Sequence, residues 1–570
     1  MLTPNRSRAA AVRPSRHEAA GAAVAFIAVA LSSLLLALAT PAPASAQGQS
    51  ENERKAQRLV AAIQSGDADG GTAYDAACYF ALAGKTDEAF RYLEQAVERG
   101  FANPGKYKSD PDLAGLHQDP RWPAILEKAA AKEREQQSAF WNRKEFWDNP
   151  TLQTPYRENL SAEEKLAGLA KFWSEVKYNF ANFDLVPDLN WDAALLEFIP
   201  KVQGTRSTLE YYQVLQEMCA RLRDGHTNVS APHELDDELY TWPQVRTRLI
   251  ENHVIVAGVS DALRRDGIEV GQEVVEVNGL PVRQYAEQKV KPYTSSSTPQ
   301  DLEMRLYESY LFMGSAKEPI ELTLRDEQGR SLKKTVRRLT REQAAQASRE
   351  AVKSGKTPTP PFEWKMLPGE VAYVKLNTFA DAKAADMFAA AFDEIAASKA
   401  MIIDLRNNSG GDSGVGWRIL GYLTDKPFKT SKWDTRQYRP AFRAWGRAQE
   451  TYGKEAGEYQ PEGKKHYARP VVVLTGPRTF SAAEDFMVSY VTMKRGLTVG
   501  EPTGGSTGQP LYFSLPGGGG AVVCSKRDRF PDGRDFVGKG VQPDVLVRPT
   551  LADFRTKRDT VLEAALKELK

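Results

Sequence analysis

Cysteine and histidine are scarce in this 570-residue sequence, which holds 3 Cys and 6 His. The cysteines, Cys78, Cys219 and Cys524, are odd in number and widely spaced, so at most one disulfide bond can form and a disulfide-rich scaffold is excluded. Cys78 and Cys219 lie in apolar helical patterns, which favours buried thiols over a cysteine nucleophile. No CxxC, HExxH or paired-histidine spacing occurs, so we predict neither a metal site nor a cofactor.

A surplus of charge of either sign is lacking as well. The chain has 76 Lys+Arg against 74 Asp+Glu, a formal net charge of +2. This balance argues against a nucleic-acid-binding surface and against a polyanionic substrate. At 41% hydrophobic and 26% charged residues the composition is that of an ordinary globular protein. The length suggests about three or four domains.

Long apolar runs are confined to the N-terminus. Four arginines precede an apolar run over residues 19–39, and an A-x-A cleavage site, Ala44 to Ala46, follows it. This pattern predicts a secretory signal peptide over residues 1–46, cleaved near Ala46, with no stable membrane span afterwards. Because the run is nearly long enough to cross a bilayer, an uncleaved signal anchor is the alternative. In both cases the body of the protein is expected outside the cytoplasm.

The stretch from Arg469 to Gly508 has a strand, turn and helix pattern. Pro470 to Thr475 is a short apolar run rich in β-branched residues, which predicts a buried strand, and a helix with apolar residues at helical spacing should begin at Ser481. This layout places one serine at a helix N-terminus, where free N–H groups favour negative charge. The sequence SAAE also fits a capping box, in which Ser481 only starts the helix and Glu484 reaches back.

Four short motifs occur in order along the second half of the chain: IIDLRNNSGG (402–411), TFSAAEDF (479–486), VGEPTGG (499–505) and GVQPDV (540–545). They resemble motifs of the tail-specific, or C-terminal processing, protease family S41, and the resemblance runs from about Ser161 onward. It implies a serine endopeptidase that acts on polypeptide substrates without a cofactor or metal. Together with the signal peptide it implies a bacterial periplasmic or secreted enzyme.

The resemblance allows two catalytic arrangements that differ in the base. In one branch a serine–lysine dyad carries its lysine in the Gly-rich loop, and Ser506 stands at that position here. A neutral serine cannot take the hydroxyl proton near neutral pH. The tricorn-like branch resembles a serine–histidine arrangement, and His226 of the DGHT stretch stands at its histidine position; a histidine pKa of about 6.5 suits a general base. The alternative is that DGHT is a helix-ending turn whose histidine makes structural hydrogen bonds.

The oxyanion hole is carried over from the same resemblance. The backbone N–H groups of Gly411 and Ala482 stand at the family's positions, and two such donors typically supply several kcal/mol. Glycine suits position 411 because the backbone there must approach the substrate closely. The alternative for the Gly-Gly pair is an ordinary strand-to-helix turn.

Two residues depart from the tricorn-like pattern. Val537 takes the place of the acid that precedes the GVxPD segment, and Gly225 takes the place of a serine beside the histidine. The residue that orients His226 therefore stays open. Its candidates are Asp535, Glu484 and Asp224.

The remainder of the chain predicts helical N-terminal regions and a β-rich domain. Residues 47–137 read as a helical unit in which the stretch 73–93 is similar to one tetratricopeptide repeat, and it serves either to dock a protein partner or as a packing appendage. Residues 138–236 are predicted to be the helical N-terminal region of the protease, which must pack on the core if His226 is to reach Ser481.

Residues 240–342 resemble a PDZ domain, with a hairpin signal at Asn278-Gly279. Such a domain binds extended peptides at a sheet edge; a degenerate domain that only gates or braces the protease is the alternative. A linker over 343–364 and a core over 365–560 follow, and the alternation of strands and helices in the core predicts an α/β sandwich like that of ClpP and crotonase. The predicted fold class is thus α+β multidomain.

These predictions describe a secreted serine endopeptidase with Ser481 as nucleophile and His226 as base. The alternative is a catalytically inactive peptide- or ligand-binding module on the same fold, which the missing lysine and the missing acid would favour.

Overall fold

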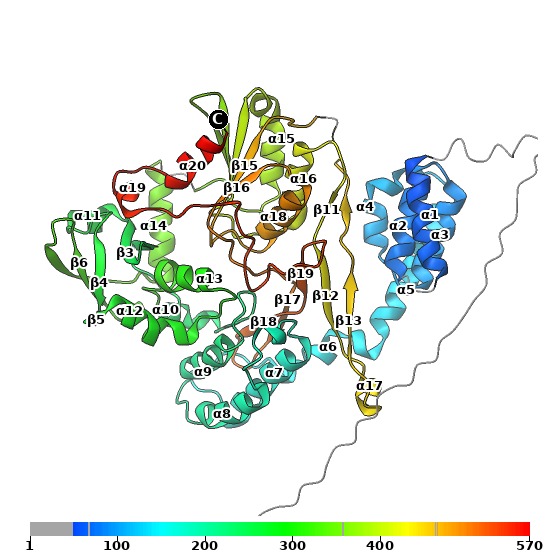
Figure 1. Cartoon of the computed structure of the whole chain (residues 1–570). Coiled ribbons are helices and arrows are strands. Elements are labelled where there is room, and N and C mark those ends of the chain that lie inside the picture. The colour runs from blue at the N-terminus through cyan, green and yellow to red at the C-terminus, as the bar shows by residue number, and fades with distance from the viewer. Residues whose placement is uncertain (1–49, 66–68, 356–357, 462, 464, 570) are drawn as a thin grey trace, which may run out of the picture. The chain divides into compact units, whose positions relative to one another are not determined.

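The computed structural model describes residues 50–65, 69–355, 358–461, 463 and 465–569. The predicted signal peptide lies outside the described residues. The chain divides into two compact units, Met1–Asn142 and Arg143–Lys570. Each unit has its own hydrophobic core. Figure 1 shows the helices and strands of both units.

The first unit is helical. It consists of α1 (Glu51–Gln64), α2 (Gly70–Leu82), α3 (Thr86–Glu98), α4 (Pro104–Ser109) and α5 (Trp122–Ser138), with a short 3₁₀ turn before α5. Small residues of α2 and α3, such as Ala77 and Ala89, are fully buried, which lets these two helices pack closely. The helical character agrees with the sequence pattern; the likeness to a tetratricopeptide repeat stays a prediction.

The second unit is built on a six-stranded sheet with the strand order β20-β16-β15-β10-β9-β8. The strands are β8 (Phe362–Leu367), β9 (Val371–Leu376), β10 (Ala400–Asp404), β15 (Val471–Thr475), β16 (Leu497–Gly500) and β20 (Val545–Leu546). All neighbours pair in parallel except β8 and β9. Every residue of β10 and β15 is buried, which explains why these strands are continuous apolar runs.

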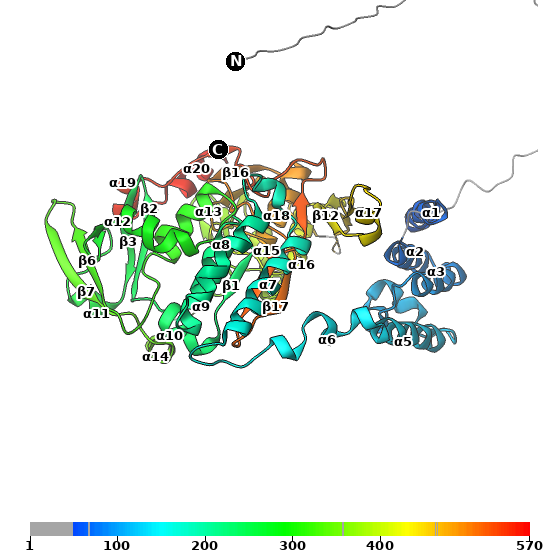
Figure 2. The ribbon, with the colours of Figure 1, turned by 90° about the horizontal axis from the view of Figure 1, so that it is seen from below.

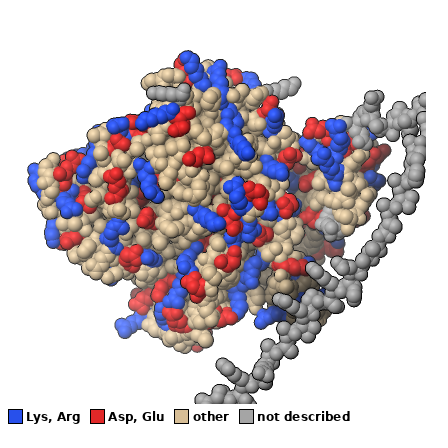
Figure 3. All heavy atoms as spheres, in the orientation of Figure 1, with Lys and Arg blue, Asp and Glu red and all other residues tan. Residues whose placement is uncertain are grey.

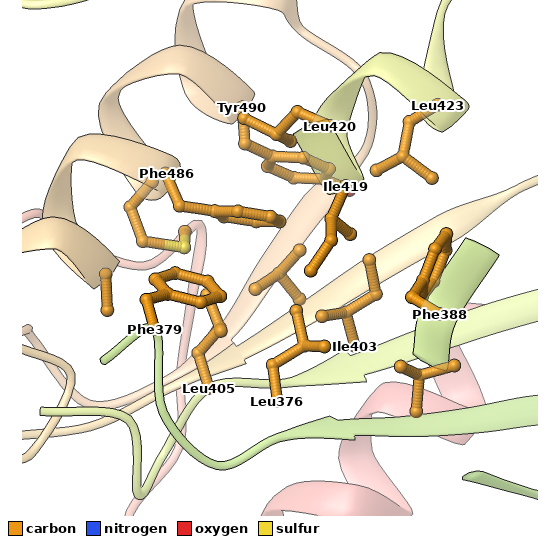
Figure 4. Close-up of a cluster of buried hydrophobic side chains, with 14 of the residues drawn as sticks. Leu376, Phe379, Phe388, Ile403, Leu405, Ile419, Leu420, Leu423, Phe486 and Tyr490 are labelled. Atoms are coloured by element: carbon orange, nitrogen blue, oxygen red, sulfur yellow. The ribbon is translucent and has the colours of Figure 1, made fainter. Parts of the chain in front are cut away.

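Helices cover both faces of this sheet. On one face, Leu376 and Ile403 pack against side chains of α15 (Lys383–Ala396), α16 (Ser413–Leu420) and α18 (Ala482–Met493), among them Phe486 (Figure 4). On the other face α20 (Thr560–Glu568) contributes Val561 and Ala565 to a smaller core. The result is a layered α/β core that presents the start of α18 at the ends of the parallel strands.

A helical region packs against this core. It contains α7 (Ala162–Asn179), α8 (Trp191–Gln203) and α9 (Thr208–Ala220), and its buried side chains form one cluster with those of β17 (Pro510–Ser514) and β18 (Gly520–Cys524). Directly after α9, β1 (Asn228–Ser230) pairs antiparallel with β18, so that Asn228 lies opposite Val522. This pairing ties the chain next to His226 to the catalytic core.

The β-rich region contains a six-stranded antiparallel sheet. Five strands follow in sequence order, β2 (Val245–Ile250), β3 (His253–Val259), β4 (Glu273–Val277), β6 (Ile320–Arg325) and β7 (Ser331–Val336), and the short β5 (Leu280–Pro281) pairs with β4 beside them. Asn278 and Gly279 both have positive φ in the tight turn after β4, as the Asn-Gly signal predicts. A helix, α13 (Pro299–Met304), lies between β4 and β6 in the chain and reaches the core (Figure 2). The identity of this region as a PDZ domain stays a prediction.

Two polar segments also take on structure. The first half of the predicted linker, residues 343–353, is helical and belongs to α14 (Arg341–Lys353), which Thr340 and Gln343 cap. The insert after α16 forms a long hairpin of β12 (Lys432–Gln437) and β13 (Glu450–Lys454), and β12 pairs with β19 (Arg527–Arg529). Basic and acidic side chains are interspersed on the face in Figure 3. No helix of the described residues is long and apolar enough to cross a membrane.

Candidate active site

Ser481 sits at a strained turn between β15 and α18. Its backbone has φ 55° and ψ −126°, a conformation that costs a non-glycine residue about 1–3 kcal/mol and that is found at functional sites. An ordinary helix-capping serine has an extended backbone instead. Glu484 reaches back as the predicted capping box requires, because the Ser481 N–H donates to Glu484 Oε2 at 3.3 Å. The Ser481 hydroxyl itself is directed to His226.

His226 is held by the turn that follows α9. Asp224 Oδ1 accepts hydrogen bonds from the His226 backbone N–H at 3.0 Å and from the Thr227 hydroxyl at 2.9 Å. The ring nitrogen Nε2 lies 3.0 Å from Ser481 Oγ, and Nδ1 lies 2.8 Å from Ser506 Oγ. The two residues predicted from separate motifs, 255 positions apart, are therefore in hydrogen-bond contact.

An aromatic ring and a distant cation define the surroundings of the imidazole. The Phe480 ring stacks on it with centroids 4.8 Å apart and an interplanar angle of 8°. The Arg305 guanidinium lies 5.4 Å from the centroid of the same phenyl ring. Burial first, and then the positive charges of Arg305 and Lys526, lower the pKa of His226 to about 4. The imidazole is thus neutral at neutral pH. In the tautomer that carries its proton on Nδ1, this N–H donates to Ser506 Oγ and Nε2 can accept the Ser481 proton.

Ser506 is the functional residue that sequence reasoning noticed only as the site of a missing lysine. Its hydroxyl is the group in contact with Nδ1 of His226, and it is fully buried. The signal was present, because a position that carries the base in one branch of the family must adjoin the nucleophile. The sequence does not show that the Ser506 hydroxyl lies within hydrogen-bond distance of Nδ1 of His226.

None of the three carboxylates proposed to orient His226 contacts its ring. Asp224 bonds the backbone of the turn, and Asp535 pairs with Arg529 at 3.0 Å. Glu484 accepts the backbone N–H groups of Gly505 at 2.8 Å and Ser506 at 2.9 Å, so it holds the loop that carries Ser506. Burial raises the pKa of this carboxyl to about 8. Val537, at the position of the missing acid, is fully buried in the apolar core.

The loop after β10 lies against Ser481. Asn408 Oδ1 accepts the Gly410 N–H at 2.9 Å, and the Asn408 carbonyl accepts the Phe480 N–H at 3.1 Å. A Cβ on Gly410 would lie 2.7 Å from Ser481 Cβ, and one on Gly411, at φ 136°, would lie 2.1 Å from Ala380 N, so both positions require glycine.

The backbone N–H groups of Gly411 and Ala482 donate to no acceptor among the described residues. Gly411 and Ala482 line, together with Ser481, a cavity of about 650 Å³. Two free N–H groups beside a serine hydroxyl are the arrangement that can stabilise an oxyanion.

Comparison with known proteins assigns part of the chain. The model of peptidase family S41 matches residues 370–547. This segment is an S41 peptidase domain. Two curated relatives match: the chloroplastic C-terminal processing peptidase of Tetradesmus obliquus, 29% identical over 182 residues, and the chloroplastic carboxyl-terminal-processing peptidase 2 of Arabidopsis thaliana, 29% identical over 179 residues. These alignments cover 32% and 31% of this chain and 36% and 31% of the relatives, so the chain spans about a third of their length.

Solved structures resemble a larger part of the chain than the S41 domain. Mature CPAF complexed with lactacystin has a TM-score of 0.57 at 15% identity and covers 72% of this chain and 98% of its own. A second structure of mature CPAF has a TM-score of 0.51 at 15% identity over 70% of this chain and 94% of its own. The likeness confirms the predicted class, a mixed α and β multidomain fold with a helical N-terminal region.

The S41 domain holds most of the candidate site, but not all of it. Ser481, Ala482, Gly411 and Ser506 lie inside it, whereas His226 comes from the helical region that precedes the β-rich region. The domain confirms the family resemblance that four sequence motifs indicated. Because the histidine lies outside it, the site is complete only when the helical region packs on the domain through the pairing of β1 with β18.

Proposed function

We propose that the protein is an exported serine endopeptidase that cleaves polypeptides, with Ser481 as nucleophile and His226 as general base. The observation that carries the proposal is the 3.0 Å contact between Ser481 Oγ and Nε2 of a half-buried, neutral His226. Export rests on the predicted signal peptide alone. The curated relatives are named for C-terminal processing, and cleavage near a substrate's C-terminus is proposed here by analogy.

The mechanism follows from the atoms in contact. Ser481 Oγ attacks the peptide carbonyl carbon while its proton passes to Nε2 of His226, and the carbonyl oxygen becomes an oxyanion that accepts the N–H groups of Gly411 and Ala482. The protonated imidazole then gives its proton to the leaving amine, and an acyl-enzyme forms. Water attacks this ester with His226 again as the base, which releases the acid product and restores the serine.

Labelling with a fluorophosphonate probe tests the proposal directly. Purified protein lacking residues 1–46 should become labelled on Ser481, and Ser481→Ala and His226→Ala should each reduce labelling by about 100-fold or more. His233→Ala serves as the matched control, because His233 is exposed and pairs only with Glu234 at 3.1 Å. Mass spectrometry of the labelled peptide identifies the serine.

A second candidate function is an inactive peptide-binding module on the same fold. It is favoured by one observation: no carboxylate contacts the His226 ring among the described residues, and Val537 fills the acid's position. If the wild-type protein is not labelled and leaves unfolded casein intact, the peptidase proposal is wrong and this second function takes its place.

A further inference from the structure

A carboxylate lies one helical turn after the candidate nucleophile. Asp485 lies in the first turn of α18, four residues after Ser481, the residue that precedes the helix. Both line the cavity of about 650 Å³ that also contains the free N–H groups of Gly411 and Ala482. Whatever side chain enters this cavity from a substrate therefore meets Asp485 close to the reacting atoms.

Asp485 is a buried acid that forms no salt bridge among the described residues. It is 9% exposed, and its two oxygens accept hydrogen bonds from the hydroxyls of Ser413 at 2.6 Å and Ser431 at 3.0 Å. No ion pair of Asp485 is present within the described part of the chain. Buried charges in proteins are normally paired, because neutral hydroxyls do not repay the loss of solvent. Burial, and then the nearby Asp528 carboxylate, raise the pKa of Asp485, although the bonds from the two serine hydroxyls and the positive charge of Lys526 oppose this shift.

Among the described residues, the one lysine in the lining of the cavity acts on Asp485 through space but forms its salt bridge with another acid. This residue is Lys526, and its ammonium group lies 3.0 Å from Asp528, which is 2% exposed. Asp412 adds a second carboxylate to the lining; its Oδ1 accepts the Gly414 N–H at 2.8 Å and caps α16. Lys526 and Asp528 neutralise each other, so Asp485 and Asp412 leave the cavity negative.

We propose that this cavity is a specificity pocket for a cationic side chain, lysine or arginine, on the substrate residue that supplies the scissile carbonyl. The inference rests on the proposed peptidase function. The carbonyl of that residue would sit between Ser481 and the N–H groups of Gly411 and Ala482, so its side chain is the one nearest the cavity. Each Asp485 oxygen keeps a lone pair beyond its serine bond, which an ammonium or guanidinium group can use. Trp417 adds an aromatic surface to the lining for the aliphatic part of the side chain.

Two covalent probes that differ only in this side chain test the pocket. We would compare diphenyl phosphonate esters with an N-acylated arginine-like or leucine-like side chain, and measure the rate at which each labels Ser481. The arginine-like probe should react at least about 10-fold faster, because an unpaired buried carboxylate favours the cation and opposes the aliphatic group. Asp485→Asn keeps the size of the side chain and should lower this ratio by about 10-fold, whereas Asp532→Asn, an exposed acid paired with Arg534, should not change it.

The outcomes separate the pocket from the peptidase function. If a fluorophosphonate without an amino-acid side chain labels Ser481 but the leucine-like probe reacts as fast as the arginine-like probe, or neither probe reacts, the specificity pocket is wrong and the peptidase function stands. If the fluorophosphonate also fails, the peptidase function itself is wrong. The ratio measured on the wild-type protein needs no variant, so poor folding of Asp485→Asn would leave the test intact.

Discussion

The hydroxyl of Ser506 stands where the dyad branch of the S41 family carries its lysine, and here it bonds His226, the residue that we propose as base. Glu484 contributes indirectly, because its carboxyl group accepts a hydrogen bond from the Ser506 backbone N–H. The orienting group is thus a hydroxyl on a loop that a buried acid fixes.

Replacement of Ser506 tests this positioning role. In Ser506→Ala the Nδ1–H of His226 loses its acceptor, so the productive tautomer is less favoured, and Ser481 labelling should slow by about 10- to 100-fold. Ser506→Thr keeps the hydroxyl and should restore most of the rate. A substrate assay should place the loss in kcat with little change in KM, since Ser506 does not line the cavity. An unchanged labelling rate in Ser506→Ala would contradict the role.

The lowered pKa of His226 predicts that the labelling rate of Ser481 falls only at a pH well below the pKa of an ordinary histidine. Its pKa in the folded protein is about 4 against a usual value of about 6.5, so the neutral base persists as the pH falls and is lost only on crossing about pH 4. The Ser481 labelling rate should therefore be level from pH 8 to about pH 5. The stability of the folded state should fall between about pH 6.5 and pH 4, because the unfolded chain takes up the proton first. Circular dichroism at each pH separates the two effects, and a midpoint near pH 6.5 in folded protein would contradict the prediction.

At the scale of elements, the segment that begins with α13 holds the site from the side of the β-rich region. The Thr298 hydroxyl donates to the Gly504 carbonyl at 2.8 Å, and the Gln300 amide donates to the Thr503 carbonyl at 2.9 Å. Both contacts fix the loop that carries Ser506. Arg305, in the turn that follows α13, reaches Phe480 and through it the surroundings of His226.

Removal of the Arg305 charge should raise the pKa of His226. Arg305 pairs with buried Asp301 at 2.8 Å, so a single change would leave an unpaired buried carboxylate. We therefore expect the double variant Arg305→Gln with Asp301→Asn to move the acid limb of Ser481 labelling upward by up to about one pH unit, because a nearby positive charge disfavours imidazolium. The matched control is Arg330→Gln, an exposed arginine of the same region that pairs with Asp326. An unshifted limb in a folded double variant would show that Arg305 does not tune the base.

Local elements were predictable, whereas contacts between them were not. The strand expected over Pro470 to Thr475 is β15 (Val471–Thr475), and the helix expected from Ser481 is α18, because an apolar run and an apolar helical face mark each of them. The helix α14 was missed because it buries no residue and so shows no apolar face. The bond between His226 and Ser506 spans 280 positions and depends on the pairing of β1 with β18, which no local pattern reveals.

At the scale of the whole molecule, the two units have separate cores. The apolar core of the first unit is formed by residues 56–129, and the candidate site is assembled from residues between His226 and Ser506 of the second unit. None of the buried clusters in the second unit contains a residue from the first. Formation of the site should therefore not require the helical unit.

Deletion of the first unit tests this independence and separates the two roles left open for it. A chain of residues 143–570 should label on Ser481 within about twofold of the rate of the protein that lacks only residues 1–46, because its cores are complete. If the unit docks substrates, casein cleavage should slow while labelling stays the same; if it is a packing appendage, both should stay the same. A folded truncated chain that no longer labels would contradict the independence of the site, and Ser481→Ala in the truncated chain sets the background.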